Sequence, residues 1–219
     1  GWMAYMGWLD GMAGMDGWMG CMHGMHGMGG NSEGFISHYD KLENPQVIYV
    51  TPEGQYPLSM HVGPQWHRRT WSVTDVGNKA WKSADKMVSN YILKTIKKVS
   101  KEYKVSDVYL MGFSQGAVYA YTIGLQNPDM IKGVIGFSGY LMDTEGDKSI
   151  LTQQDIEEGK AVRLFIAHGI DDAAIKVETA RKLKAMFESQ GFDLTYTEFE
   201  GRHGIEAAIF NDAVNWMQL

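Results

Sequence analysis

A serine stands between two glycines in residues 112–116, which read Gly-Phe-Ser-Gln-Gly. An apolar run over 108–113 leads into it, and an alanine-containing helical pattern follows at once. A serine at such a strand-to-helix turn is lifted clear of the sheet, where its hydroxyl can attack a carbonyl carbon. Glycine on both sides suits the crowding of the turn, because a Cβ there would strike the neighbouring strand or helix. The pattern predicts acyl transfer through Ser114, and an ordinary glycine-flanked turn is the alternative interpretation.

Two histidines follow Ser114 in the chain, His168 and His203. A serine hydroxyl is a weak nucleophile until a base takes its proton, and an acid must orient that base. When the serine stands at such a turn, the acid and then the base follow it, each after a later strand. His203 lies in a glycine-flanked turn after the last strand pattern, so it is the predicted base. His168 ends the preceding strand, beside the candidate acids, and we predict a structural role for it.

Three carboxylates are candidates for orienting His203. Asp171 and Asp172 both follow the strand predicted over 162–167, and their spacing alone does not choose between them. Asp143 follows the strand before that one. The acid of the predicted triad therefore stays open at this point.

Acyl transfer also needs N–H donors for the negative oxygen that develops in the transition state. The amide of Gln115, directly after the serine, is the first predicted donor. The run 26–30, His-Gly-Met-Gly-Gly, is predicted to supply the second donor from the Met28 amide. Without Ser114 downstream, that run would be interpreted as one more fragment of low-complexity sequence.

The elements that must position these residues are predicted from the hydrophobic periodicity beyond Asn31. Strand patterns cover 47–51, 108–113, 134–137, 162–167 and 194–199. Five separate helical patterns accompany these strands. The first begins at Asn31 or Ser32, the second covers 78–103, and the third runs from the serine to Asn127. The fourth covers 180–187 before a stop at Gly191, and the fifth covers 205–217. Strands that alternate with helices predict an α/β fold with a mostly parallel central sheet and helices on both faces. Residues 1–219 are predicted to form a single domain.

Residues 1–30 differ in composition from the rest of the chain. Ten are glycine, eight are methionine and three are tryptophan, with no valine or isoleucine. Glycine is a poor strand former, so no regular structure is predicted there. A copper(I) site is a minor hypothesis for this segment, because thioether, imidazole and thiolate ligands suit that ion. Its ligands would be Met22, His23, Met25, His26 and Met28 with Cys21.

The composition limits which binding partners and which cellular compartment are expected. The 219 residues include 20 basic and 26 acidic side chains, a net charge of −6, which makes a nucleic-acid partner improbable. The lysines of 94–104 are interpreted as the solvated face of a helix. Cys21 is the only cysteine, so no internal disulfide can form. No run of 18 apolar residues is present, so no transmembrane segment is expected, and we expect a cytoplasmic location.

Five segments together resemble the phospholipase/carboxylesterase family, small α/β-hydrolases that include acyl-protein thioesterases and bacterial carboxylesterases. The matching segments are 26–31, 112–116, 137–141, 168–172 and the glycine-flanked His203. The resemblance implies the α/β-hydrolase fold with little or no lid, no metal or organic cofactor, and a small-molecule or lipid-like acyl ester substrate. It also implies that Asp172, four residues after the histidine of His-Gly-x-x-Asp, is the triad acid in preference to Asp171 and Asp143.

The sequence departs from the family pattern at several positions. Ala173 and Lys176 stand where the family commonly has prolines, so the acid loop lacks two residues that would restrict its backbone. Ala117 replaces a frequent glycine and is expected to be tolerated. The segment before His26 lacks the usual apolar strand.

The leading hypothesis is a serine carboxylesterase that works through an acyl-enzyme on Ser114. The alternatives are a lysophospholipase or thioesterase specificity, and a non-catalytic hydrolase-like binding domain. Trp66 and Trp71, in the long connection 52–76, are candidates for substrate binding, and packing of the loop against the protein is the equal alternative. The oligomeric state is not predicted.

Overall fold

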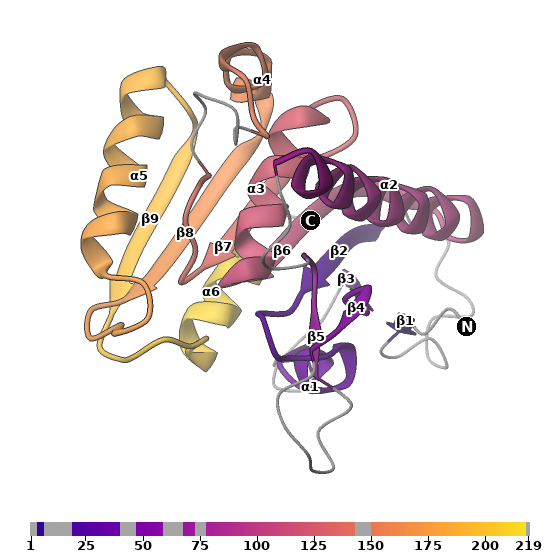
Figure 1. Cartoon of the computed structure of the whole chain (residues 1–219), viewed down its shortest axis with the longest axis horizontal. Coiled ribbons are helices and arrows are strands. Elements are labelled where there is room, and N and C mark those ends of the chain that lie inside the picture. The colour runs from indigo at the N-terminus through magenta and orange to yellow at the C-terminus, as the bar shows by residue number, and fades with distance from the viewer. Residues whose placement is uncertain are drawn as a thin grey trace.

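The computed structural model describes residues 4–6, 19–39, 47–58, 68–72, 78–142 and 150–217. A seven-stranded sheet runs through the molecule in the order β1-β3-β2-β6-β7-β8-β9 (Figure 1). Its strands are β1 (Ala4–Met6), β2 (Met19–Met25), β3 (Val47–Pro52), β6 (Val105–Phe113), β7 (Gly133–Phe137), β8 (Arg163–Gly169) and β9 (Leu194–Phe199). Every neighbouring pair is parallel except β1 with β3. The predicted mostly parallel sheet is confirmed.

Helices cover both faces of this sheet, as predicted. One face packs against α2 (Asn78–Glu102), α3 (Gln115–Gln126), α5 (Val177–Gln190) and the short α4 (Gln153–Glu158), which a 3₁₀ turn over Gly159–Ala161 extends. The other face packs against α1 (Ser32–Ile36) and α6 (Ala207–Trp216). Among the helices of the described residues, none is long and apolar enough to cross a bilayer.

Strand β6 shows how the two cores are divided. Leu110 belongs to the core beneath α2 and α3, whereas Tyr109 and Met111 belong to the core beneath α1 and α6. A strand that is buried on both faces needs apolar residues at every position, which is why 108–113 reads as a continuous apolar run. The register of the nucleophile strand is therefore fixed from both sides.

Strand β2 corrects the prediction for residues 1–30. It lies between β3 and β6 and is buried, although its sequence, Met-Gly-Cys-Met-His-Gly-Met, has no β-branched residue. At Gly24 a Cβ would lie 2.5 Å from the Tyr49 hydroxyl and 2.8 Å from the Phe35 ring. The glycine thus makes room for large aromatic side chains, and pairing with two apolar neighbours outweighs the poor strand propensity.

The same strand separates the ligands of the copper(I) hypothesis. Met22 packs into the core beneath α1 and α6, and Met25 into the core beneath α2 and α3. Side chains on opposite faces of a sheet cannot bind one ion. Within the described ranges, no group of three or more His, Cys, Asp or Glu side chains could hold a metal ion.

Helix ends follow the sequence signals. Asn31 caps α1 by accepting a hydrogen bond from the Gly34 amide at 2.7 Å. Helix α5 ends at Gly191, whose φ of 81° is a left-handed conformation. Helix α4 and the small sheet of β4 (Tyr56–Pro57) with β5 (Arg69–Thr70) were not predicted.

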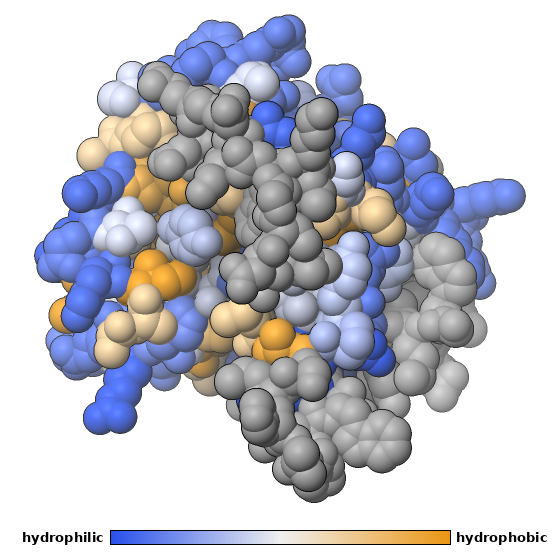
Figure 2. Space-filling view, in the orientation of Figure 1, coloured by the Kyte–Doolittle hydropathy of each residue, from blue (hydrophilic) through white to orange (hydrophobic). Residues whose placement is uncertain are grey.

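The lysines of α2 are solvent-exposed, as interpreted from the sequence. Lys94, Lys97, Lys98 and Lys101 point away from the apolar face of the helix, and Lys104 follows its end. Figure 2 shows hydrophilic side chains along the outer surfaces of α2 and α5.

Two fully buried tyrosines allow a matched test of the packing. Tyr109 donates its hydroxyl to the Met217 carbonyl at 2.7 Å, whereas the Tyr121 hydroxyl has no partner in the described part of the chain. We expect Tyr109→Phe to lower the free energy of unfolding by about 1 kcal/mol, because it leaves a buried carbonyl unpaired. Tyr121→Phe should leave that free energy unchanged or raise it. Urea denaturation of both variants is the measurement, and a larger loss for Tyr121→Phe would contradict the described packing.

Candidate active site

Ser114 occupies a strained turn between β6 and α3. Its φ of 53° and ψ of −117° are rare for a residue with a side chain. The Ser114 amide donates to the Phe137 carbonyl at 2.9 Å, and the Ser114 carbonyl accepts from the Ala117 amide at 3.0 Å. Hydrogen bonds on both sides of the serine thus hold the strained conformation. This is the sharp strand-to-helix turn that the motif predicted.

The flanking glycines are required by close backbone contacts. A Cβ at Gly112 would lie 2.3 Å from the Gly116 carbonyl, and a Cβ at Gly116 would lie 2.0 Å from the Met25 carbonyl oxygen. Ala117 is tolerated because the residue that faces it, Gly139, has no side chain. Its Cβ points at Gly139, where any side chain would come within 2.4 Å of it.

The structure brings Asp172 to His203. Asp172 Oδ2 lies 2.7 Å from His203 Nδ1, and the Asp172 side chain is fully buried while 25% of the His203 side chain is exposed. The Asp171 side chain is exposed, and its backbone amide donates to the Gly201 carbonyl at 2.9 Å. Asp143 lies outside the described residues.

His203 lies beside the strand that carries the serine. Its ring packs against Phe113, the residue before Ser114, with ring centroids 4.8 Å apart. Directly after the neighbouring strand β7, the Ser138 hydroxyl donates to the Gly204 carbonyl at 3.4 Å. The serine turn and the histidine loop are therefore neighbours at the carboxyl edge of the sheet.

The acid loop keeps its shape without the prolines of the family pattern. Asp172 Oδ1 accepts from the Ala174 and Ile175 amides, each at 2.8 Å. Lys176, where a proline is common, has a φ of −58°, a value that a proline ring also adopts. At Gly169 a Cβ would lie 2.4 Å from the Arg202 carbonyl oxygen, so the acid loop and the histidine loop touch backbone to backbone.

Hydrogen bonds set the charge of the acid and the tautomer of the base. Burial on its own would raise the pKa of the Asp172 carboxyl, but bonds from two backbone amides and His203 outweigh burial and hold that pKa below its usual 3.8. The carboxylate accepts, so His203 Nδ1 carries the proton and His203 Nε2 is left to accept one.

His168 has the structural role that the sequence predicted. Its side chain is fully buried, and its Nε2 donates to the Ile175 carbonyl at 2.8 Å. The same nitrogen lies 3.3 Å from Asp172 Oδ2. His168 therefore contacts the acid loop at the Ile175 carbonyl and at the same Asp172 oxygen that bonds to His203.

The two predicted oxyanion donors lie on adjacent segments. Strand β2 leads into a turn in which the Gly30 amide donates to the Gly27 carbonyl at 3.0 Å and Gly29 has a φ of 81°. The close contact of Gly116 with Met25 places this turn beside the start of α3. Neither the Met28 amide nor the Gln115 amide has an acceptor in the described part of the protein.

Trp71 is not placed to contact substrate. It is fully buried in the core beneath α2 and α3, and its indole N–H donates to the His26 carbonyl at 2.7 Å. This burial favours the alternative interpretation, in which the Trp71 side chain packs the loop against the His26 turn. Trp66 lies outside the described residues.

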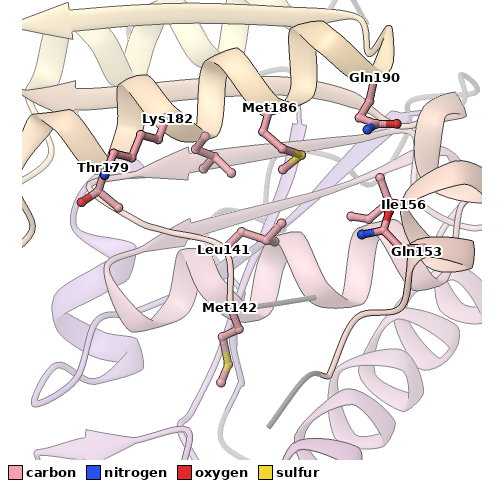
Figure 3. A pocket seen from close by; sticks show the side chains of 9 residues that line it. Leu141, Met142, Gln153, Ile156, Thr179, Lys182, Met186 and Gln190 are labelled. Atoms are coloured by element: carbon pink, nitrogen blue, oxygen red, sulfur yellow. The ribbon is translucent and has the colours of Figure 1, made fainter. Parts of the chain in front are cut away.

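A pocket of about 370 Å³ lies apart from these residues, between α4, α5 and the segment after β7 (Figure 3). It is lined by Leu141, Met142, Gln153, Ile156, Thr179, Lys182, Leu183, Met186 and Gln190. No candidate catalytic residue contributes to its lining.

Comparison with known proteins confirms the family resemblance. The phospholipase/carboxylesterase family matches residues 24–219. The chain belongs to this family. A probable carboxylesterase SOBER1-like protein of Arabidopsis thaliana is 26% identical over 56% of this chain and 44% of its own length. Acyl-protein thioesterase 1 of Aspergillus fumigatus is 26% identical over 64% of this chain and 63% of its own. The match thus spans less than two thirds of either relative.

Solved structures show the same fold at low sequence identity. Zea mays acyl-protein thioesterase 2 superposes with a TM-score of 0.75 at 15% identity, covering 99% of this chain and 97% of that one. A Bacillus cereus carboxylesterase gives a TM-score of 0.71 at 15% identity, covering 99% of this chain and 93% of that one. The α/β-hydrolase fold predicted from the sequence is confirmed.

The hydrogen bonds of Asp172 predict a pH-dependent contribution to stability. Asp172→Asn should lower the free energy of unfolding at pH 7 by about 2 kcal/mol, because two amides and His203 lose a charged acceptor. The folded-state pKa lies below the unfolded value near 3.8, so this contribution is complete well above pH 3.8 and is lost as the pH falls through the folded-state pKa.

Chemical denaturation from pH 7 down to pH 3 measures this difference. Asp171→Asn, on the exposed neighbour, is the control and should change stability little at any pH. A wild-type advantage over Asp172→Asn that persists unchanged at pH 3 would contradict the assignment.

Proposed function

We propose that the protein is a serine carboxylesterase that hydrolyses acyl esters through an acyl-enzyme on Ser114. The observation that carries the proposal is the 2.7 Å hydrogen bond between Asp172 and His203 beside the strained turn of Ser114. The acid, the base and the nucleophile come from the carboxyl ends of β8, β9 and β6, in the chain order of an α/β-hydrolase.

In the acylation step, His203 Nε2 accepts the Ser114 hydroxyl proton while the serine oxygen forms a bond to the ester carbonyl carbon. The carbonyl oxygen becomes an oxyanion, which the Gln115 and Met28 amides stabilise. When this intermediate collapses, the bond to the alkoxy group breaks and His203 donates its proton to the departing alcohol. Asp172 keeps its negative charge throughout and stabilises the histidine cation.

Deacylation repeats the same steps with water as the nucleophile. His203 accepts a proton from water, the hydroxide adds to the acyl carbon, and the carbonyl oxygen returns to the same two amides. Collapse releases the carboxylic acid and restores the proton to Ser114. The N-terminus of α3 favours negative charge at this point, since its first amides and dipole point at the oxyanion.

Thioester hydrolysis is the second candidate, because the relatives include proteins named acyl-protein thioesterase. The same groups serve both reactions, since a thiolate is a better leaving group than an alkoxide. A chain-length series of p-nitrophenyl esters, assayed beside an acyl thioester and a lysophospholipid, tests the substrate class. Equal inactivity on all three would favour a non-catalytic hydrolase-like domain.

Ser114→Ala should abolish covalent labelling by a fluorophosphonate and lower kcat by at least ~10³. His203→Ala should fall to a similar level, and the double variant should be no slower, because triad residues act as a unit. Initial rates of ester hydrolysis and labelling with a fluorescent fluorophosphonate are the measurements. Wild-type turnover in folded Ser114→Ala protein would remove this serine from the mechanism.

Two glycines near His203 test the placement of the base. A Cβ at Gly169 would meet the Arg202 carbonyl oxygen at 2.4 Å, whereas a Cβ at Gly204 would meet nothing within 4 Å. Gly169→Ala should shift the histidine loop and lower kcat by about 10², the loss expected for a displacement near 1 Å. Gly204→Ala is the matched control and should keep wild-type kcat. Similar kcat values for the two folded variants would contradict this contact.

A further inference from the structure

The Gln115 side chain forms hydrogen bonds with three consecutive residues at the end of β5 and directly after it. Its Oε1 accepts from the Thr70 hydroxyl at 2.9 Å and from the Trp71 amide at 3.0 Å, and its Nε2 donates to the Ser72 hydroxyl oxygen at 3.0 Å. Because a backbone amide can only donate, the contact with Trp71 fixes which side-chain atom of Gln115 is the oxygen. The side chain of the residue after the nucleophile is thus held at both of its polar atoms.

These bonds satisfy a buried stretch of chain. Thr70, Trp71 and Ser72 are 4%, 0% and 2% exposed, and the Trp71 amide donates to Gln115 rather than to a backbone carbonyl. A buried backbone N–H without an acceptor is costly. The conformation of this segment therefore depends on the Gln115 side chain.

The same segment holds the turn that carries the second proposed oxyanion donor. The Gly29 amide donates to the Arg69 carbonyl at 2.8 Å, and the Arg69 amide donates to the Gly30 carbonyl at 2.9 Å. The Trp71 indole donates to the His26 carbonyl at 2.7 Å. These three bonds hold the turn on both sides of the donor.

Gln115 is therefore connected to both proposed oxyanion donors. Its own backbone amide is the first donor, and its side chain binds the segment that holds the second donor, the Met28 amide. A change of the Gln115 side chain leaves the backbone amide in place. The contribution of the side chain can thus be measured separately from that of the amide.

We propose that the Gln115 side chain is a positioning group for the oxyanion hole and acts through residues 70–72 on the Met28 turn. The proposal rests on the ester hydrolysis proposed above. Oxyanion donors stabilise a transition state only when they are held within about 0.5 Å of their productive position. The three bonds of the side chain set the distance between the two donors, while its polar atoms stay bonded to the protein.

The test replaces Gln115 by methionine in the full-length protein, because methionine has a similar length but cannot form these three bonds. Gln115→Met should lower kcat about 10-fold or more and leave KM within about 2-fold, because the hole acts on the transition state. Affinity for a trifluoromethyl ketone, which forms an oxyanion on Ser114, should fall by the same factor as kcat. Affinity for the parent methyl ketone should stay at the wild-type value.

Trp71→Phe interrupts the same connection at its other end, because it removes the indole N–H that binds the His26 carbonyl. It should lower kcat and leave KM in the same way. The double variant should be no slower than the slower single variant, since both changes break one connection. Losses of kcat that multiply in the double variant would mean that the two side chains act independently, and they would overturn the proposal.

Gln126→Met is the matched control, because it makes the same exchange at the other end of α3. Gln126 Nε2 donates to the Ile150 carbonyl at 3.0 Å, and both glutamines are partly buried. Gln126→Met should lose this hydrogen bond and keep the wild-type kcat and both wild-type ketone affinities.

Wild-type kcat in folded Gln115→Met protein overturns the proposal, and so does a loss equal to that of Gln126→Met. A loss confined to KM, or an equal fall in affinity for both ketones, also overturns it. If Gln115→Met does not fold, Trp71→Phe decides alone by the same criteria. The proposed function is judged separately, because no turnover by the wild-type protein, or turnover that survives in Ser114→Ala, would overturn the esterase assignment and this inference with it.

Discussion

Helix α3 begins in direct backbone contact with the end of β2. The contact requires Gly116, since any Cβ there would lie within 2.0 Å of the Met25 carbonyl oxygen and 2.7 Å of the His26 carbonyl oxygen. It fixes the strained turn of Ser114 on one side and places the turn of Met28 on the other. The proposed nucleophile and both proposed oxyanion donors thus depend on one close approach between the start of α3 and the end of β2.

The sequence predicted those parts of the structure that depend on local rules. The turn at Ser114 could be recognised because Gly112 and Gly116 are required by its geometry, and the end of α5 because Gly191 adopts a left-handed conformation. Strand β2 could not be predicted, since its stability comes from pairing with β3 and β6 rather than from its own residues. Local propensity has no information about such partners.

The side chains of the candidate site were harder to predict from the sequence than the turn at Ser114. Spacing left Asp171 and Asp172 equivalent, and only the family pattern favoured the residue that the structure brings to His203. The sequence left two interpretations of Trp71 open, because an aromatic residue in a long loop can either bind a ligand or pack the loop against the protein, and its burial is a tertiary property. The burial of Asp85 was not predicted, although an acidic residue between Ala84 and Val88 on the apolar face of a helix is a signal of it.

The two buried aspartates show how the protein uses one residue type in opposite ways. Asp172 receives bonds from two backbone amides and His203, so its pKa lies below the usual value and its charge is available to a histidine cation. Asp85 receives one bond, from Tyr119, and burial raises its pKa. Donors therefore surround the Asp172 carboxylate, which the proposed mechanism needs in its charged form, whereas the Asp85 carboxylate accepts one hydrogen bond from the described residues. Two carboxylates of similar burial thus differ in the direction of their pKa shift because they differ in the number of hydrogen bonds that they accept.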